Sequence, residues 1–449
     1  MKVGFAVADI TPETGIYLTG YGHPERLATG VHSQLKATVM LLQDREKTVA
    51  VIGFDWCYMD APVVGEIKRG ISGASGIPET NLLLCCSHTH SAPHTASNRS
   101  LGHVSVDPEC KGFAYVMKNI PVIARAVCRA LASARGAEAG FAAGKTRTGV
   151  SRRGKDDTGR VAAFIGDPDL IYDDNMTAVL FRDRETHEDI GILVHCSAHN
   201  TCMGIDRNIS SDWCGVMRDR IKQRYQVPVL FLNGACGDVG PRTNVPIQYP
   251  SLHGFAAGGG DGPASAAEVG FRAAGDALRL LENLRDFRSD LPLKLMISKV
   301  TMPQEIPMSE EEARRIVTEY GASHPEKVAE PPVNYQIARV MLKVWSEPKQ
   351  PEFEFEQSLV AFGPLALAPF PFEMFSVFSL RLRKYGPFQY TLLCSNANGY
   401  NAYLPDRGAV AVGGYEAACR KEICSYVTKP EAGDLAVVQT LKALREMQK

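Results

Sequence analysis

Short apolar runs alternate with helix-like segments along the first half of the chain, and this alternation constrains the fold more than any other feature. The apolar runs cover residues 48–54, 82–86, 192–194 and 229–232, and a helical pattern covers residues 115–135. Runs of this length and composition are typical of strands that are buried on both faces. Strands that alternate with helices form α/β sheets. The sequence therefore predicts an α/β fold.

The second half of the chain adds a glycine-rich loop and further helical patterns. The loop covers residues 258–263, and helical patterns cover residues 265–285 and 335–345. Domains average about 150 residues, so a length of 449 residues allows two or three of them. No linker separates two units, however. We therefore expect one large domain over residues 1–449, with a helical and loop insertion at residues 246–350.

Charge and composition exclude several classes of protein. The chain has 49 basic and 50 acidic residues and a net charge of −1, which argues against nucleic-acid binding through a broad basic face. No apolar run reaches the roughly 18 residues of a membrane helix, and the N-terminus lacks an apolar signal segment. None of the 12 cysteines belongs to a C-x-x-C motif, so we expect small buried thiols in a reducing compartment. These features predict a cytoplasmic protein without membrane insertion, and they leave its oligomeric state open.

Three histidines within seven residues follow the strand predicted at residues 82–86. They are His88, His90 and His94. In an extended segment, residues i and i+2 point to the same side. We therefore expect His88 and His90 to face one pocket at the carboxyl edge of the sheet, where open α/β sheets place ligands. Histidine is the commonest metal ligand, so the cluster predicts a metal site; local hydrogen bonds within a loop are the alternative.

Further candidate groups follow later strands. His195 and His199 form a second cluster, and on chemistry alone either could complete a metal site. The glycines of residues 236–241 allow a close backbone approach to a ligand, and Asp238 among them could orient that ligand. Glu373 ends an apolar strand just before a helical pattern. It could be a metal ligand or a charge that the helix dipole favours.

Taken together, these pieces resemble one family, the neutral ceramidases and their shorter bacterial relatives. The motifs that carry the resemblance keep the same order from residue 8 to about residue 420. They are Ala8-Asp9-Ile10-Thr11-Pro12, Gly20-Tyr21, Gly30-Val31-His32, Ser87-His88-Thr89-His90-Ser91-Ala92-Pro93, His199-Asn200-Thr201-Cys202-Met203, Ile209-Ser210-Ser211-Asp212, Cys236-Gly237-Asp238-Val239-Gly240-Pro241, Glu373 with Arg381-Leu382-Arg383, Asn398 with Tyr400 and Tyr403, and Tyr415-Glu416-Ala417. Each motif alone is of moderate specificity, but the ordered set is specific.

The resemblance implies a catalytic domain with two mixed β-sheets flanked by helices, and a zinc site within it. The implied Zn²⁺ ligands are His88, His199, Glu373 and Tyr403. The implied substrate-facing residues are His90, Arg152 and Tyr415, with Arg153 as the alternative to Arg152. Zinc lowers the pKa of bound water to about 7 and polarises a carbonyl oxygen. The resemblance therefore implies a zinc-dependent hydrolase that uses metal-activated water to cleave an amide C–N bond in a small-molecule substrate.

Two departures from the family pattern bear on the substrate. Gly240 stands where the family has a serine that has been proposed as a nucleophile, so a mechanism through that serine is excluded. The chain also stops near the end of the catalytic domain, without the family's C-terminal immunoglobulin-like domain. We therefore expect a small soluble amide rather than ceramide. The same water activation would serve an ester, a lactone or a phosphoester, and a metal-binding relative without catalysis is a further alternative.

The spacing of the family's N-x-Y-x-x-Y motif implies different roles for two neighbouring tyrosines. It makes Tyr403 the ligand and leaves Tyr400 to pack or to form a hydrogen bond. A phenol has a pKa of about 10, so it binds a metal ion only when the ion stabilises the phenolate. We therefore expect the metal affinity to depend on Tyr403 and to fall at low pH.

Overall fold

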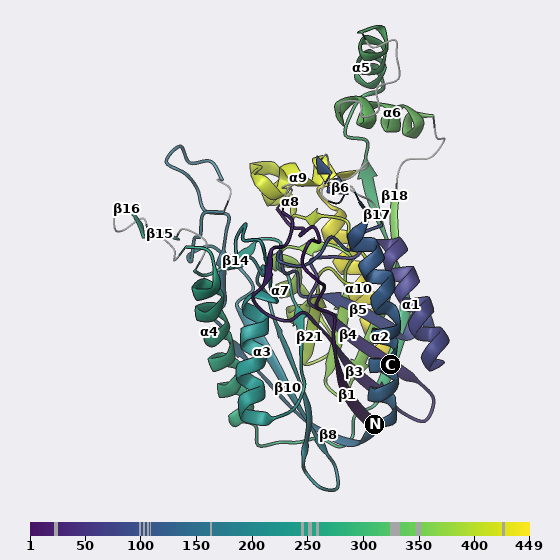
Figure 1. The fold of residues 1–449 in the computed structure, drawn as a ribbon, viewed down its shortest axis with the longest axis vertical. Helices are drawn as coiled ribbons and strands as arrows, with labels where there is room; N and C mark the ends of the chain where they lie inside the picture. Colours follow the sequence, from purple (N-terminus) through teal and green to yellow (C-terminus); the bar gives the residue numbers. More distant parts are fainter. Residues whose placement is uncertain are drawn as a thin grey trace.

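Two mixed β-sheets lie face to face at the centre of the fold, and helices cover the outer face of each (Figure 1). The computed structural model describes residues 1–449 except 22–25, 98–99, 102–103, 106, 108, 162–163, 244–246, 250–253, 257–259, 324–332, 347–351 and 424–426. This arrangement confirms the predicted α/β fold with two mixed sheets flanked by helices.

The first sheet has eight strands among the described residues. Their order is β13 (Val229–Asn233), β11 (Asp189–Cys196), β10 (Asn175–Asp183), β8 (Arg135–Lys145), β1 (Lys2–Asp9), β3 (Lys36–Gln43), β4 (Thr48–Phe54) and β5 (Leu82–Cys86). The pairs β4–β5 and β11–β13 are parallel, and the other pairs are antiparallel. The runs predicted at residues 48–54 and 82–86 coincide with β4 and β5.

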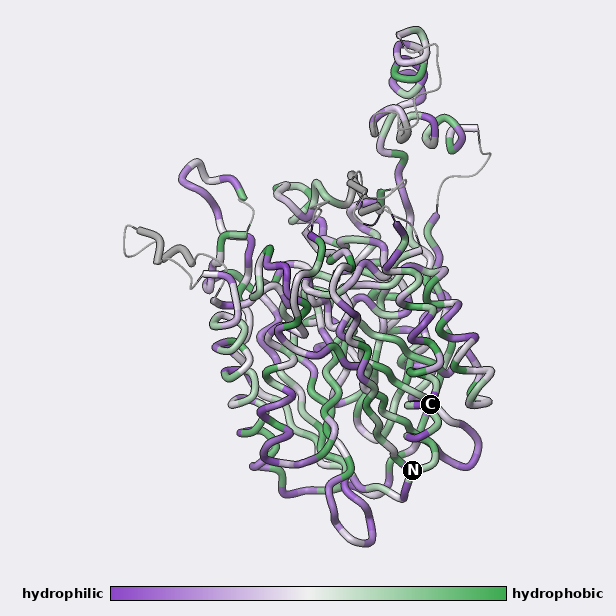
Figure 2. Tube along the Cα trace, in the orientation of Figure 1, coloured by the Kyte–Doolittle hydropathy of each residue, from purple (hydrophilic) through white to green (hydrophobic). Residues whose placement is uncertain are grey.

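Both faces of the first sheet are buried, and β3 shows how its residues divide between them. Val39 and Leu41 pack with the helices α1 (Ala61–Ser75) and α2 (Lys111–Ala132), whereas Met40 and Leu42 face the second sheet. At the other end of the sheet, α3 (Asp212–Tyr225) and α4 (Pro263–Glu282) cover β10, β11 and β13. Figure 2 shows apolar stretches running through this packed body and hydrophilic loops at its lower end.

The second sheet has five strands among the described residues. Their order is β21 (Tyr390–Cys394), β19 (Leu365–Pro369), β18 (Glu352–Phe362), β17 (Leu293–Glu305) and β23 (Val427–Thr428). The pair β19–β21 is parallel and the others are antiparallel. The helices α7 (Ser376–Tyr385) and α10 (Ala432–Gln448) pack on its outer face.

The segment 246–350, which we expected to be a helical and loop insertion, is largely integral to the fold. Its helix α4 covers the first sheet through an apolar stripe that includes Val269, Ala273 and Ala277. Its strand β17 pairs along its length with β18. The helical pair α5 (Glu310–Ser323) and α6 (Val333–Trp345) projects from the body beyond the ends of β17 and β18, and the short strands β15 (Ile247–Tyr249) and β16 (Gly254–Ala256) stand off it beyond α4 (Figure 1). Within 246–350, residues 246, 250–253, 257–259, 324–332 and 347–350 lie outside the described part.

Short strand pairs and short helices lie outside the two main sheets. The pairs are β2 (Gly30–Val31) with β12 (Asn208–Ile209), β6 (Ser100–Leu101) with β7 (Val104–Ser105), β9 (Gly149–Ser151) with β14 (Val239–Pro241), β15 (Ile247–Tyr249) with β16 (Gly254–Ala256), and β20 (Glu373–Met374) with β22 (Tyr403–Leu404). The remaining helices are η1 (Glu79–Asn81), α8 (Arg407–Val412) and α9 (Tyr415–Ile423).

The first sheet curves so that its edge strand β13 packs against β3, β4 and β5. Gly53 on β4 permits this contact, because a Cβ atom there would come within 2.9 Å of the Phe231 carbonyl oxygen. The Asn233 side chain then donates a hydrogen bond to the Ser87 carbonyl at 2.9 Å. The loops that follow β5 and β11 are neighbours as well, since Thr89 and Asn200 form a parallel β-bridge.

Candidate metal centre

Three ionisable side chains meet in the interior, where these loops approach the second sheet. Glu373 Oε2 lies 3.3 Å from His88 Nε2 and 3.0 Å from His199 Nε2. The three side chains are buried, each with 3% exposure or less. Two imidazoles and a carboxylate thus present one atom each to a common point.

Backbone carbonyls fix which nitrogen of each ring faces that point. His88 Nδ1 lies 2.9 Å from the Cys57 carbonyl oxygen, and His199 Nδ1 lies 2.6 Å from the Cys236 carbonyl oxygen. A carbonyl oxygen only accepts hydrogen bonds, so each Nδ1 carries the proton. The neutral form of each ring therefore has its lone pair on Nε2, which is the arrangement that metal-ligating histidines usually have.

Two of the three atoms at this point lack the hydrogen bonds that buried polar atoms normally form. Within the described part of the chain, His199 Nε2 and Glu373 Oε2 have no hydrogen-bond partner. Burial lowers the pKa of His199 to about 4, so its ring is neutral near pH 7. The pKa of Glu373 is held well below its ordinary value, because His88 and His199 together outweigh the effect of burial. A lone pair thus faces a carboxylate oxygen, and a bound cation would stabilise this pair of acceptors.

The distances and donor types also fit zinc. Nitrogen and oxygen ligands lie about 2.0–2.2 Å from zinc, so two of them at a tetrahedral angle lie about 3.3 Å apart. The separations of 3.3 and 3.0 Å from Glu373 Oε2 to the two Nε2 atoms are close to this value. The donor set of two imidazoles and one carboxylate is also found at catalytic zinc sites.

Glu373 reaches the centre from the short strand β20. This strand pairs in parallel with β22, and the register places Glu373 beside Tyr403. Asp238 caps the following helix α7 instead of Glu373, because Asp238 Oδ1 accepts hydrogen bonds from Ser376 N and Oγ at 2.9 and 2.7 Å. The carboxylate at the N-terminus of α7 is therefore that of Asp238, a role that we had considered for Glu373.

The glycine-rich turn contacts backbone rather than a ligand. Gly237 N donates a hydrogen bond to the Met374 carbonyl at 2.9 Å. A Cβ atom on Gly237 would lie 2.6 Å from the Glu373 carbonyl oxygen. We predicted that the backbone of this turn approaches a ligand. It instead approaches the backbone of the strand that carries Glu373 and holds that strand in place.

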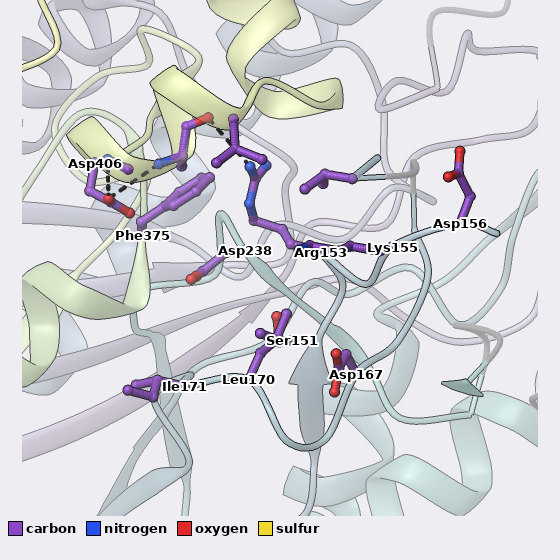
Figure 3. Close-up of a pocket in the computed structure, with 14 residues that line it drawn as sticks. Ser151, Arg153, Lys155, Asp156, Asp167, Leu170, Ile171, Asp238, Phe375 and Asp406 are labelled. Carbon is purple, nitrogen blue, oxygen red and sulfur yellow. Dashed lines mark hydrogen bonds between the residues drawn. The ribbon is translucent and has the colours of Figure 1, made fainter. Parts of the chain in front are cut away.

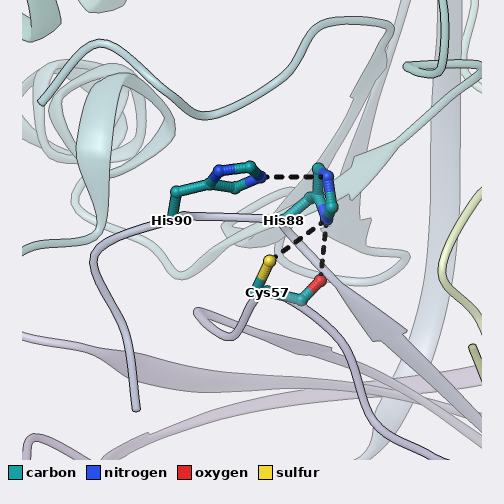
Figure 4. A group of neighbouring side chains, drawn as sticks. All are labelled: Cys57, His88 and His90. Atoms are coloured by element: carbon teal, nitrogen blue, oxygen red, sulfur yellow. Dashed lines mark hydrogen bonds between the residues drawn. The ribbon is translucent and has the colours of Figure 1, made fainter. Parts of the chain in front are cut away.

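His90, Arg152, Tyr403 and Tyr415 line a cavity of about 380 Å³ next to the three buried side chains. His90 Nε2 lies 3.2 Å from His88 Nε2 (Figure 4). Burial, followed by the neighbouring His88 and His199, lowers the pKa of His90 well below its ordinary value. His90 is therefore a neutral imidazole between the cluster and the cavity.

Arg152 lines the cavity and forms hydrogen bonds with Tyr403 and Glu416. Its Nη2 donates a hydrogen bond to the Tyr403 hydroxyl at 3.0 Å, and its Nε donates one to Glu416 Oε1 at 3.0 Å. Burial raises the pKa of Tyr403 well above its ordinary value, the Glu373 carboxylate raises it further, and Arg152 lowers it. Glu416, whose role the sequence did not reveal, thereby fixes the guanidinium that faces the cavity.

Arg153, the alternative to Arg152, faces a different cavity of about 590 Å³ (Figure 3). Its Nη1 pairs with Glu416 Oε2 and its Nη2 donates to the Gly413 carbonyl at 2.7 Å. Glu416 therefore lies between two guanidinium groups, one in each cavity wall. Arg152 is the one that contacts Tyr403.

Two predicted histidines lie outside the cluster. His195 Nε2 donates a hydrogen bond to the Leu393 carbonyl at 2.7 Å, and Arg383 Nη2 lies 3.3 Å from His195 Nδ1. His195 thus bridges β11 and β21, which leaves His199 as the histidine of this segment in the centre. The His94 ring packs edge-on against Tyr58, with the ring centroids 6.0 Å apart.

His88 and His90 are neighbours, but not because the segment is extended, as we predicted. His88 has a φ of 69°, so the segment turns at this residue and is not extended. The rings of His88 and His90 stand at 85°, and their centroids are 4.8 Å apart. His88 therefore faces the buried cluster while His90 lines the cavity.

Two thiols lie beside the histidines, which the absence of a cysteine motif had not suggested. Cys57, His88 and His90 form one group with candidate ligand atoms within 4.8 Å of one another (Figure 4), and His88, His199 and Cys236 form another. Cys57 Sγ lies 3.5 Å from His88 Nδ1, on the side of the ring away from Glu373. The described residues thus contain groups that could hold a metal ion.

Comparisons with known proteins give matches to ceramidases. A sequence model of the family described as neutral/alkaline non-lysosomal ceramidase, N-terminal, matches residues 1–247. Neutral ceramidase B of Dictyostelium discoideum is 27% identical over 138 residues, which cover 30% of this chain and 18% of the relative. The match thus spans less than a fifth of that relative's length.

Solved structures match over a longer part of the chain. The crystal structure of neutral ceramidase from Pseudomonas aeruginosa matches 99% of this chain and 74% of its own, with a TM-score of 0.73 and 17% identity. A structure described as ceramidase complexed with C2 matches 99% of this chain and 75% of its own, with a TM-score of 0.69 and 17% identity. At this identity, the likeness shows a shared fold.

Proposed function

Because the chain belongs to the neutral/alkaline non-lysosomal ceramidase family, we propose that it is a zinc-dependent hydrolase that cleaves an amide C–N bond. The observation that carries the proposal is the buried meeting point of His88 Nε2, His199 Nε2 and Glu373 Oε2 beside a cavity. Tyr403 is the proposed fourth ligand, since it lies next to Glu373 in the strand register.

The residues around the cavity support hydrolysis rather than a purely structural metal. When bound, zinc lowers the pKa of a water molecule and polarises a carbonyl oxygen. His90 is a neutral imidazole at the cavity wall, so it can take up a proton and pass it to a leaving amine. Arg152 carries a charge that can hold a carbonyl oxygen of the substrate. A structural zinc would need neither group, which argues against a relative without catalysis.

Tyr415 completes the cavity wall, and Gly240 lines it as well. Gly240 offers no hydroxyl, so this wall has no serine nucleophile. The proposed mechanism therefore depends on activated water and has no acyl-enzyme intermediate. Its proton transfers fall to His90.

The cavity supports a compact substrate. Its volume of about 380 Å³ lies near the lower end of the roughly 300–1,000 Å³ of ligand sites. We therefore propose that the amide is compact, whereas the family to which the chain belongs favours a lipid amide over the small soluble amide that we expected. Phe164 and Ile205 line the cavity with 41% and 65% exposure. Exposed apolar side chains suit a substrate with an apolar chain, so long-chain amides such as ceramide are included in the same test.

Metal analysis and a substrate panel test the proposal. We expect about one zinc ion per chain in the wild type, loss of zinc in His199→Ala, and retention in the control His195→Asn. The panel contains N-acyl amides of short and long chain length, carboxylic esters, lactones and phosphoesters. Higher kcat/KM for esters or phosphoesters than for amides would overturn the amide assignment. Bound zinc without hydrolysis of any class would favour the relative without catalysis.

We also propose that the protein acts in the cytoplasm. Nine cysteines of the described part are free thiols, which supports a reducing compartment; they are Cys57, Cys85, Cys86, Cys128, Cys196, Cys202, Cys214, Cys236 and Cys394. Among the described residues, no helix is both long and apolar enough to cross a bilayer. Cell fractionation tests the location, and recovery outside the cytosolic fraction would contradict it.

A further inference from the structure

The two carboxylate oxygens of Glu373 have different surroundings. Oε1 accepts a hydrogen bond from the Tyr400 hydroxyl at 2.9 Å. Oε2 faces His88 Nε2 and His199 Nε2 and has no hydrogen-bond partner among the described residues. One oxygen is therefore satisfied by the protein, and the other is left for the cluster.

The Tyr400 ring is held in place by a second aromatic ring. Tyr400 stacks on Tyr58 with the ring centroids 4.3 Å apart and an angle of 18° between the rings. Tyr58 is itself buried, and its hydroxyl lies 3.2 Å from Thr19 Oγ1. The stack leaves the Tyr400 hydroxyl directed at Glu373.

The loop that carries Tyr400 is tied to both strands that deliver ligands. Asn398 N donates to the Leu84 carbonyl at 2.8 Å, and Leu84 N donates to Asn398 Oδ1 at 3.0 Å. Glu373 N donates to the Ala402 carbonyl at 2.9 Å. Tyr400 thus lies between β5, which precedes His88, and β20, which contains Glu373.

We propose that Tyr400 is a positioning residue for the metal centre, and that its hydroxyl holds Glu373 so that only Oε2 is presented to the ion. A free carboxylate can offer one or both oxygens to a metal ion. Partners that hydrogen-bond a ligand fix its orientation, and their loss typically lowers metal affinity about 10- to 100-fold. With Oε1 engaged, Glu373 occupies one coordination position and leaves room for water. This inference rests on the proposed function, since it assumes a bound ion.

Cobalt substitution tests the role of the hydroxyl. The full-length wild type, Tyr400→Phe and Tyr58→Phe are freed of metal and titrated with Co²⁺, and the visible absorption of the bound ion reports its coordination number. We expect one ion per chain in all three proteins. In Tyr400→Phe, Glu373 gains freedom to bind through both oxygens, so the absorption should weaken and the affinity should fall about 10- to 100-fold.

Tyr58→Phe is the matched control, because it removes a hydroxyl of the same kind from the other ring of the stack. It should keep the wild-type spectrum and affinity. A wild-type spectrum and affinity in Tyr400→Phe would overturn the inference, as would equal changes in both variants, which would assign the effect to packing. Failure of the wild type to bind Co²⁺ at all would instead overturn the proposed metal centre.

Discussion

Replacing Tyr403 by phenylalanine should make zinc binding less dependent on pH. The Tyr403 hydroxyl accepts a hydrogen bond from Arg152 at 3.0 Å, and burial, followed by the Glu373 carboxylate, raises its pKa well above the ordinary value. Below that pKa the phenol keeps its proton. A phenolate ligand therefore forms only if zinc displaces the proton, and the variant has no such proton to lose.

The size of the effect follows from proton linkage. Each proton displaced on binding raises the affinity tenfold per pH unit below the pKa of the group. Ionising an ordinary phenol at about pH 7, some three units below its pKa, costs roughly 4 kcal/mol. Burial of Tyr403 increases this cost, and the charge of Arg152 offsets part of it. Between about pH 6 and 8, the wild type should gain about 100-fold more in affinity than Tyr403→Phe.

Competition with a chromophoric chelator at several pH values measures these affinities. Protonation of the histidine ligands affects wild type and variant alike, so it cancels in the difference of slopes. Tyr415→Phe is the matched control, since Tyr415 lines the same cavity with its ring centroid 5.9 Å from that of Tyr403. It should keep the wild-type slope. Equal slopes for wild type and Tyr403→Phe would refute ligation by Tyr403.

Three further substitutions test the surroundings of the centre. His90→Gln should keep its zinc and lose about 10²- to 10⁴-fold in kcat/KM; loss of zinc in metal analysis would make His90 a ligand. Glu416→Gln removes the charge shared by the buried Arg152 and Arg153 and should lower the free energy of unfolding by about 3 kcal/mol, whereas an unchanged urea midpoint would contradict that cost. Burial raises the pKa of Asp238 to about 7, so the folded state binds more protons than the unfolded state between about pH 4 and 7 and loses stability as pH rises. Between about pH 5 and 8 the wild type should therefore lose about 3 kcal/mol of stability that Asp238→Asn does not lose. If the urea midpoints of the variant change with pH as those of the wild type do, the raised pKa of Asp238 is wrong.

Strands buried on both faces were predictable because their sequences are continuously apolar. β4 and β5 begin and end at the predicted residues, and polar residues Asp55 and Ser87 mark their carboxyl ends. β17 escaped prediction because it is only half buried along much of its length. The helix α4 was predicted as a helix but assigned to an insertion, because its apolar face does not reveal which sheet it covers. That information lies in β10, β11 and β13, far away in the sequence.

The residue types at the site were predictable, but their geometry was not. His88 and His90 were paired on the assumption of an extended segment, whereas His88 has a positive φ. The curvature that brings β13 to β4 depends on a contact at Gly53, which reads as an ordinary strand residue. The hydrogen bond of Tyr400 spans 27 residues and that of Arg152 with Glu416 spans 264. No local pattern encodes such partners.

Hydrogen bonds between the two sheets set the geometry of the centre more closely than the core does. The contact between the sheets is apolar, and the hydrophobic effect is strong but has no direction, so it tolerates small displacements. The direction comes from backbone bonds at the sheet ends: Ser395 N donates to the Asn233 carbonyl at 3.0 Å, and Cys86 N donates to the Asn396 carbonyl at 3.2 Å. These bonds join the ends of β13 and of β5, which precedes His88, to the segment that leads to Tyr403. A few directional contacts around a non-directional core thus bring residues from both sheets within ligand distance of one ion.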